Sequence, residues 1–190
     1  MTPSLHQMIT WLWIGLGLVW LAAAPFARAT RRREPVLPRL AYLAAGFTGM
    51  ALIFWRRASA GILAWRLLPD TATVAETGIA LTLAGILFAI WARLILGANW
   101  SASVTIKQDH HLIMRGPYGL VRHPIYTGLL LALTGSAIAF GELRGFLGVT
   151  IMACGLWAKS RIEEKFMLQQ FGAAYEDYRR RVRALIPCLL

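Results

Sequence analysis

The sequence predicts an all-α polytopic membrane protein with about five transmembrane helices, and three observations point to that class. Of the 190 residues, 57% are hydrophobic, whereas soluble domains are about 45–50% apolar. The apolar residues gather in long runs, and the mean hydropathy is +0.55. Basic residues collect between and after these runs, as topology signals do. We expect the last two spans to form a helical hairpin, followed by a C-terminal amphipathic helix.

The N-terminal half of the chain is expected to hold three spans. Ile9 to Ala27 approaches the roughly 20 residues that a helix needs to cross the hydrocarbon layer, and a cluster of arginines follows it. The second span is expected at Leu40 to Trp55, and the third at Thr73 to Leu96, the longest apolar run. Between them, Gly61 to Leu68 is too short to cross, so we interpret it as an interfacial or continuing helix, with a simple connector as the alternative.

The rest of the chain opens with its longest polar segment, Gly97 to His123. Two short apolar runs follow, at Ile125 to Phe140 and at Phe146 to Trp157, and they are typical of the two arms of a helical hairpin. From Lys159 onward, apolar residues recur at three- and four-residue steps. This spacing predicts an amphipathic helix on the membrane surface or folded over the spans, which Gly172 could interrupt.

The chain is expected to divide into two regions. Residues 1–96 would form the three-span membrane region, and residues 97–190 would carry the functional site. With five crossings and the N-terminus outside, most of the 20 Lys and Arg fall on one side, which the positive-inside rule identifies as the cytoplasm. The functional site and the C-terminus are therefore expected to be cytoplasmic.

The net charge of +11 would favour nucleic acid as a partner if the protein were soluble. Here the basic residues flank apolar runs, so membrane lipid is the expected partner, and neither nucleic acid nor a protein partner is expected. Cys154 and Cys188 do not predict a disulfide framework. The neighbours His110 and His111 point in different directions and lack a completing ligand set, so no metal is expected.

The segment from Arg115 to Gly128 holds the densest group of chemically useful side chains. Pro124 suits the first position of a helix, where its missing N–H costs nothing, and this makes His123 the expected N-cap. A helix start carries unpaired N–H groups and the positive end of the helix dipole, so it can accept a carboxylate or phosphate. Glu163 and Glu164 end the other hairpin arm, and antiparallel arms bring them to the face that holds His123.

Both signs of charge beside a lipid-facing bundle suit a zwitterionic ligand with an aromatic base. Arg122, His123 or helix N–H groups would bind its acid group, a glutamate would bind its amine or hydroxyls, and Tyr118 or Tyr126 would stack on the base. The spacing equally allows a structural interpretation. In that case Arg122 and Glu164 form an interfacial salt bridge that fixes the hairpin.

Two blocks of residues carry a family resemblance. They are Gly116-Pro-Tyr118, Val121-Arg-His-Pro-Ile-Tyr126 and Gly128 in the first block, and Arg161-Ile-Glu-Glu164, Phe171-Gly172, Tyr175, Tyr178, Arg181-Val182 and Ile186-Pro187 in the second. Together they resemble the isoprenylcysteine carboxyl methyltransferase family, part of a wider group that includes phospholipid N-methyltransferases. The resemblance covers residues 97–187, with the blocks in the expected order and spacing.

The resemblance implies an S-adenosylmethionine-dependent methyltransferase of bacterial or archaeal type, in a bacterial inner membrane, acting on a lipophilic small molecule. The implied cofactor-binding residues lie on the polar loop, the first hairpin arm and the helix that follows the hairpin: Leu112, Gly116, Tyr118, His123, Pro124, Tyr126 and Glu164. The implied catalytic residues are Glu163 and Arg161, with Lys159 as a rival to Arg161 for orienting the acceptor. Gly119 stands where the family often has a basic residue, which leaves the acceptor undetermined.

Methyl transfer from a sulfonium is an in-line displacement in which the protein supplies orientation and excludes water. A carboxylate or thiolate acceptor needs no general base, whereas an amine or hydroxyl would use His123 or Glu163. The methylated atom, O, N or S, stays open, as does the oligomeric state. Two other functions stay open as well: a nicotinamide-dependent membrane reductase related to sterol reductases, and a non-catalytic membrane module whose charges fix topology.

Overall fold

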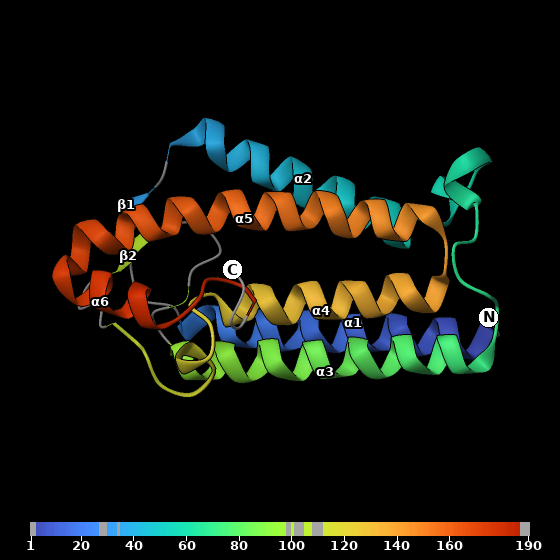
Figure 1. Ribbon diagram of the computed structural model, residues 1–190, viewed down its shortest axis with the longest axis horizontal. Coiled ribbons are helices and arrows are strands. Elements are labelled where there is room, and N and C mark those ends of the chain that lie inside the picture. The colour runs from blue at the N-terminus through green and yellow to red at the C-terminus, as the bar shows by residue number, and fades with distance from the viewer. Residues whose placement is uncertain are drawn as a thin grey trace.

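The computed structural model describes residues 3–26, 30–33, 35–97, 100, 105–107 and 112–186. Within this part of the chain, the long helices run roughly along one axis, and α6 lies at the end opposite the N-terminus (Figure 1). The α-helices are α1 (Pro3–Ala23), α2 (Val36–Phe54), α3 (Ala72–Leu96), α4 (Pro124–Phe140), α5 (Leu143–Phe171) and α6 (Ala173–Arg181). Short 3-10 turns lie at η1 (Ala24–Phe26), η2 (Arg56–Ala58), η3 (Gly61–Ala64) and η5 (Gly116–Gly119).

Two of the described helices, α2 and α3, are long and apolar enough to cross a membrane. Gln7–Ala23 and Pro124–Phe140 are shorter apolar helices. The predicted apolar runs thus became helices, and the predicted all-α class is confirmed. The count of five crossings stays a prediction, because these lengths and compositions alone do not fix it.

The predicted hairpin of α4 and α5 turns at Gly141, whose φ of 72° lies in the left-handed region that favours glycine. The prediction of a separate amphipathic helix from Lys159 was wrong in its first half, because α5 runs without a break to Phe171. No glycine or proline interrupts the chain between Trp157 and Phe171. Gly172, with a φ of 52°, ends α5 and separates it from α6, as its residue type indicated.

The expected interfacial or continuing helix at Gly61 to Leu68 is wrong for most of the segment, which fits the alternative of a connector. Only η3 is helical, and the chain beyond it pairs with the hairpin turn. The N–H groups of Leu67 and Leu68 donate to the Gly141 carbonyl, at 2.8 and 3.2 Å. Backbone groups bonded to another segment cannot also continue a helix, so the connection is extended here.

A small antiparallel sheet of β1 (Thr30–Arg33) and β2 (Thr105–Lys107) was not predicted. Thr30 pairs with Lys107, and Arg33 pairs with Thr105. The residues of β1 do not alternate between apolar and polar. Those of β2 end an alternating stretch from Ser101 to Lys107, a strand signal that the interpretation as a polar segment overlooked. The sheet joins the connection after α1 to the polar segment that leads to the motif beginning at Arg115.

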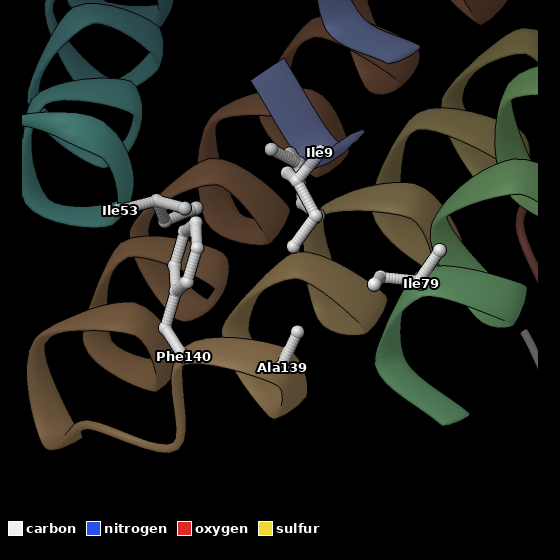
Figure 2. Packing of buried hydrophobic residues seen from close by; sticks show 6 residues of the cluster. Ile9, Ile53, Ile79, Ala139 and Phe140 are labelled. Atoms are coloured by element: carbon white, nitrogen blue, oxygen red, sulfur yellow. The ribbon is translucent and has the colours of Figure 1, made fainter. Parts of the chain in front are cut away.

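The apolar core joins α1, α2, α3 and α4. Figure 2 shows Ile9, Ile53, Ile79, Ala139 and Phe140 turned toward one another. On the outer surface of α2, in contrast, Phe47 is 79% exposed. Large exposed apolar side chains of this kind are expected where a helix faces lipid.

Gly78 and Gly85 bring α3 and α4 into direct backbone contact. A Cβ on Gly85 would lie 2.4 Å from the Ala132 nitrogen, so no larger residue fits without a shift. Between these contacts, the Thr82 and Ser136 hydroxyls lie 3.2 Å apart in the buried interface. The close packing fixes where the first turn of α4 stands relative to α3.

Candidate active site

The site begins at the junction between the polar segment and α4. His123 is the N-cap and Pro124 the first residue of α4, as predicted, but the His123 side chain does not cap the helix. Its imidazole faces α5 instead. Its Nδ1 atom lies 3.2 Å from Glu163 Oε2, and its Nε2 atom lies 3.4 Å from Glu164 Oε1.

Tyr126 extends the cluster by one helical turn. Its ring stacks on the His123 imidazole with centroids 5.5 Å apart and planes 4° from parallel. Its hydroxyl donates a hydrogen bond to Glu163 Oε1. Glu163 therefore meets His123 with one oxygen and Tyr126 with the other, which fixes the carboxylate between two groups of α4.

The Arg122 guanidinium makes four hydrogen bonds within the protein. Its Nε and Nη2 atoms donate to Glu164 Oε1 at 2.9 and 2.5 Å. Its Nη1 atom donates to the carbonyls of Arg179, at 3.2 Å, and of Val182. The predicted salt bridge that fixes the hairpin is present, and Arg122 is not left free to bind the acid group of a ligand.

The C-terminal strap, residues 182–186, covers the start of α4. The N–H groups of Arg122 and His123 donate to the carbonyls of Arg183 and Ala184, at 2.7 and 3.0 Å. The Thr127 hydroxyl donates to the Leu185 carbonyl at 2.6 Å. The expectation of free N–H groups at this helix start was wrong for residues 122 and 123, because the chain itself pairs them.

The charged groups lie beyond the apolar part of α5, which ends at Trp157. Burial alone would lower the pKa of His123, but hydrogen bonds to Glu163 and Glu164 outweigh burial and raise this pKa. Burial alone would raise the pKa of Glu164, but hydrogen bonds from His123 and Arg122 outweigh it and lower this pKa. The site therefore favours a charged histidine beside two charged carboxylates.

Glu164 has one oxygen that the described residues leave without a hydrogen bond. Its side chain is only 3% exposed, and within the described part of the chain nothing donates to Oε2. The Arg161 Nη1 atom forms an ion pair with this oxygen at the longer distance of 3.8 Å. Because buried carboxylate oxygens are normally hydrogen-bonded, Oε2 fits a donor from a ligand.

Other residues predicted to bind the cofactor lie on the approach to the cluster. Gly116 has a φ of 62° and begins η5 beside Ile95. The Tyr118 hydroxyl donates to the Ala92 carbonyl at 3.5 Å, and the Tyr118 carbonyl accepts from Tyr178 at 2.6 Å. These contacts anchor the loop between α3 and α6.

The remaining predicted residues differ in burial. Leu112 is half-buried at the start of the described loop, and Pro124 is fully buried. Neither forms a hydrogen bond to Glu163 or Glu164 in the described part of the chain. His110 and His111 lie outside the described residues.

The two candidates for orienting the acceptor occupy different surroundings. The Arg161 side chain is 57% exposed, and its guanidinium lies 5.6 Å from the centroid of the Trp157 ring. The Lys159 ammonium instead lies over two rings, 5.1 Å from the centroid of Tyr42 and 5.3 Å from that of Tyr126. Tyr42 was not foreseen, because a tyrosine inside an apolar run carries no signal of its distant partner.

Fold and site together define a helical membrane protein with a buried ionic cluster at one end of the bundle, suited to a zwitterionic ligand. Residues 73–174 match the family described as phospholipid methyltransferase. The match covers more than half of the chain, which therefore belongs to this family of membrane methyltransferases. The resemblance stated from the two sequence blocks is confirmed.

Two curated relatives and one solved structure support this membership. The protein-S-isoprenylcysteine O-methyltransferase of Schizosaccharomyces pombe is 33% identical over 99 residues, which cover 49% of this chain and 41% of the relative. Methanethiol S-methyltransferase 1 of Bradyrhizobium diazoefficiens is 26% identical over 166 residues, which cover 80% of this chain and 55% of that protein. The chain thus spans about half the length of these relatives.

The solved structure of the eukaryotic intramembrane Ras methyltransferase, isoprenylcysteine carboxyl methyltransferase, has a similar fold. The TM-score is 0.52 at 23% identity, over 82% of this chain and 54% of the other. At that identity the likeness shows the fold alone. It agrees with an integral membrane protein of several spans, while the side of the membrane and the bacterial inner membrane stay predictions.

Proposed function

We propose that this chain is an integral membrane methyltransferase that uses S-adenosylmethionine as methyl donor and a lipophilic small molecule as acceptor, with its cofactor site facing the cytoplasm. The observation that carries the proposal is the buried Glu164 oxygen without a hydrogen bond among the described residues. It lies in a fixed ionic cluster within a chain of a methyltransferase family. The family match favours methyl transfer over the nicotinamide-dependent alternative.

The residues of the cluster fit the chemistry of this cofactor. Its ammonium and ribose hydroxyls are hydrogen-bond donors, and Glu164 Oε2 is a buried acceptor in need of one. The Tyr126 and His123 rings stack on each other, and we propose that the adenine ring binds beside this aromatic pair. Leu112, Gly116, Tyr118 and Pro124 are the proposed wall of the pocket. When bound, the cofactor supplies an electrophilic methyl group on a sulfonium.

The protein's part in the reaction is to orient the two substrates and exclude water. Arg122 holds Glu164 in place through two hydrogen bonds. Glu163 is tied to both His123 and Tyr126, so its carboxylate keeps a defined position next to the proposed donor. For that reason we propose that Glu163 is a catalytic residue.

A lipophilic acceptor is supported by the position of the cluster beside apolar helices. α2 and α4 border the site, and the outer face of α2 carries exposed apolar residues such as Leu40 and Phe47. Among the relatives, the names give an isoprenylcysteine and methanethiol as acceptors. We propose that the acceptor of this chain enters from the bilayer.

Calorimetry of the purified protein with S-adenosylhomocysteine tests the proposal. We expect binding by the wild type, and a loss of affinity of about tenfold or more in Glu164→Gln, because hydrogen bonds to charged groups contribute about 1.5–3 kcal/mol. The glutamine amide keeps one oxygen as acceptor for Arg122. Its NH2 group then stands at the position of Oε2, where a donor of the ligand needs an acceptor. His123→Ala is expected to weaken binding as well.

Glu176→Gln is the matched control, because Glu176 pairs with Arg179 on α6 and touches none of the cluster. Its affinity for S-adenosylhomocysteine should equal that of the wild type. Folded wild-type protein that binds a nicotinamide cofactor and no S-adenosylhomocysteine would overturn the proposal. Normal binding by both Glu164→Gln and His123→Ala would mean that the cofactor lies elsewhere.

A further inference from the structure

We propose that Arg93 is a positioning residue of the cofactor site: it fixes the Trp100 indole beside the wall of the pocket, and so sets the affinity for the cofactor without contacting it. The inference rests on the proposed function, because it concerns the same S-adenosylmethionine site. Neither residue belongs to the two sequence blocks that carry the family resemblance.

Arg93 is a buried charge without an acidic partner. It lies in the last turn of the apolar helix α3 and is only 3% exposed. Arg144, which is 4% exposed, pairs with Glu142, whereas no carboxylate of the described residues pairs with Arg93. A buried charge is costly unless other groups compensate it. Contacts with uncharged groups must therefore hold Arg93 in its position.

Carbonyl groups at two helix ends supply the first of these contacts. The Nη2 atom of Arg93 donates to the carbonyl of Ala23, the last residue of α1, at 2.9 Å. The Nη1 atom donates to the carbonyl of Gly97, the C-cap of α3, at 2.8 Å. The carboxyl end of a helix carries partial negative charge, which favours a cation. Because α1 and α3 end on the side where α4 begins (Figure 1), Arg93 joins two helix ends near the candidate active site.

Trp100 supplies the other contact. The guanidinium carbon of Arg93 lies over the Trp100 ring, 4.5 Å from its centroid, while the Nε atom is buried without a hydrogen bond among the described residues. A guanidinium that leaves a donor unpaired and lies over an indole is oriented by stacking as well as by hydrogen bonds. The backbone N–H of Trp100 donates to the Gly97 carbonyl at 3.3 Å. Both the ring and the backbone of Trp100 are thus fixed at the end of α3.

Trp100 connects this anchor to the candidate active site. Its side chain packs against the buried cluster that contains Tyr118 and Tyr126. The Tyr118 hydroxyl donates at 3.5 Å to the carbonyl of Ala92, the residue next to Arg93. Tyr118 belongs to the proposed wall of the pocket, and Tyr126 to the aromatic pair beside which the adenine ring is proposed to bind. A shift of Trp100 therefore changes the surface that the cofactor meets.

Calorimetry of the full chain in nanodiscs with S-adenosylhomocysteine tests this role. Trp100→Leu removes the stacking partner, and Arg93→Met removes the guanidinium at similar length. We expect each variant to lose about tenfold in affinity. Because Arg93 acts through Trp100, the double variant should bind no more weakly than the weaker single variant. Arg93→Lys keeps the charge but not the planar group, so it should lose about threefold, and nothing further when residue 100 is already leucine.

Arg144→Met is the matched control. Arg144 is about as buried as Arg93 and likewise donates to carbonyls at a helix end, those of Leu52 and Ile53, at 2.8 and 2.9 Å. These carbonyls belong to the end of α2, at the end of the bundle that carries the N-terminus (Figure 1). Arg144→Met should therefore lower the melting temperature and leave the affinity for S-adenosylhomocysteine unchanged.

Wild-type affinity in Trp100→Leu would overturn the positioning role, as would losses that add up in the double variant. A lower melting temperature with unchanged affinity in Arg93→Met would also overturn it, because Arg93 would then only cap the two helices. If Arg93→Met does not fold, Arg93→Lys with and without Trp100→Leu decides by the same criteria. Wild-type protein without affinity for S-adenosylhomocysteine would instead overturn the proposed function, and the role of Arg93 with it.

Discussion

At the scale of single residues, the two oxygens of Glu164 have different roles. Oε1 accepts from Arg122 through two atoms and lies 3.4 Å from His123 Nε2. Oε2 is buried without a hydrogen bond among the described residues. One carboxylate thus both holds the hairpin ends together and offers an acceptor, so the structural and the ligand-binding interpretations of this residue are compatible.

His123 gives a residue-scale prediction about pH. Hydrogen bonds to Glu163 and Glu164 raise its pKa above the ordinary value of 6.5, although burial opposes this. A group whose pKa is raised on folding stabilises the protein fully below its unfolded pKa, and this contribution fades as the pH rises through the folded pKa. We therefore expect the melting temperature of the wild type to fall as the pH rises from 6 to 9. In His123→Gln the melting temperature should fall less over the same pH range.

Thermal unfolding in detergent measures this prediction at both pH values. The conservative variant Lys165→Gln, on the exposed end of α5, serves as control and should keep the wild-type dependence. An equal fall in the wild type and in His123→Gln would contradict a stabilising charged histidine in the cluster.

At the scale of elements, the site depends on how the C-terminal strap meets α4. The strap accepts hydrogen bonds from the N–H groups of Arg122 and His123 and from the Thr127 hydroxyl. Arg122 in turn donates to two carbonyls at the end of α6. The last elements of the chain therefore fix the motif at the start of α4 from outside, in addition to the glutamates of α5.

Thr127→Val tests the strap. It removes the hydrogen bond to the Leu185 carbonyl and keeps the shape of the side chain, so we expect a loss of about 1 kcal/mol in stability. Hydrogen exchange should quicken at the amides of Arg122 and His123. Thr134→Val is the control, because the Thr134 hydroxyl donates within its own helix, to the Leu130 carbonyl. Equal hydrogen-exchange rates at residues 122 and 123 in both variants would contradict the inference that the C-terminal strap holds the start of α4.

The elements also show what the sequence could predict. The starts of α3 and α4 were predicted to within one residue, because long apolar runs and Pro124 mark them clearly. The strands β1 and β2 were missed, because the residues of β1 do not alternate between apolar and polar and the short alternating stretch that ends in β2 lies within a segment that is polar overall. The contact between Tyr42 and Lys159 depends on the close approach at Gly155, a long-range packing effect that no local pattern carries.

At the scale of the whole molecule, the two ends of the helical bundle carry different elements and charged groups. The ionic cluster and α6 lie at one end, and the N-terminus lies at the other (Figure 1). An odd number of crossings would produce this arrangement. The exposed arginines on and after α6, Arg180, Arg181 and Arg183, favour the cytoplasm for the end that carries the site.

Labelling of single introduced cysteines tests which end of the bundle faces the cytoplasm. Gln7→Cys near the N-terminus and Asp177→Cys on α6 are both exposed positions, introduced after the native Cys154 and Cys188 are replaced by serine. In intact spheroplasts, a membrane-impermeant maleimide should label Gln7→Cys and leave Asp177→Cys unlabelled until the cells are lysed. The double-serine parent is the control for background. Labelling of both positions from outside would contradict an odd number of crossings, and labelling of Asp177→Cys alone would invert the proposed cytoplasmic site.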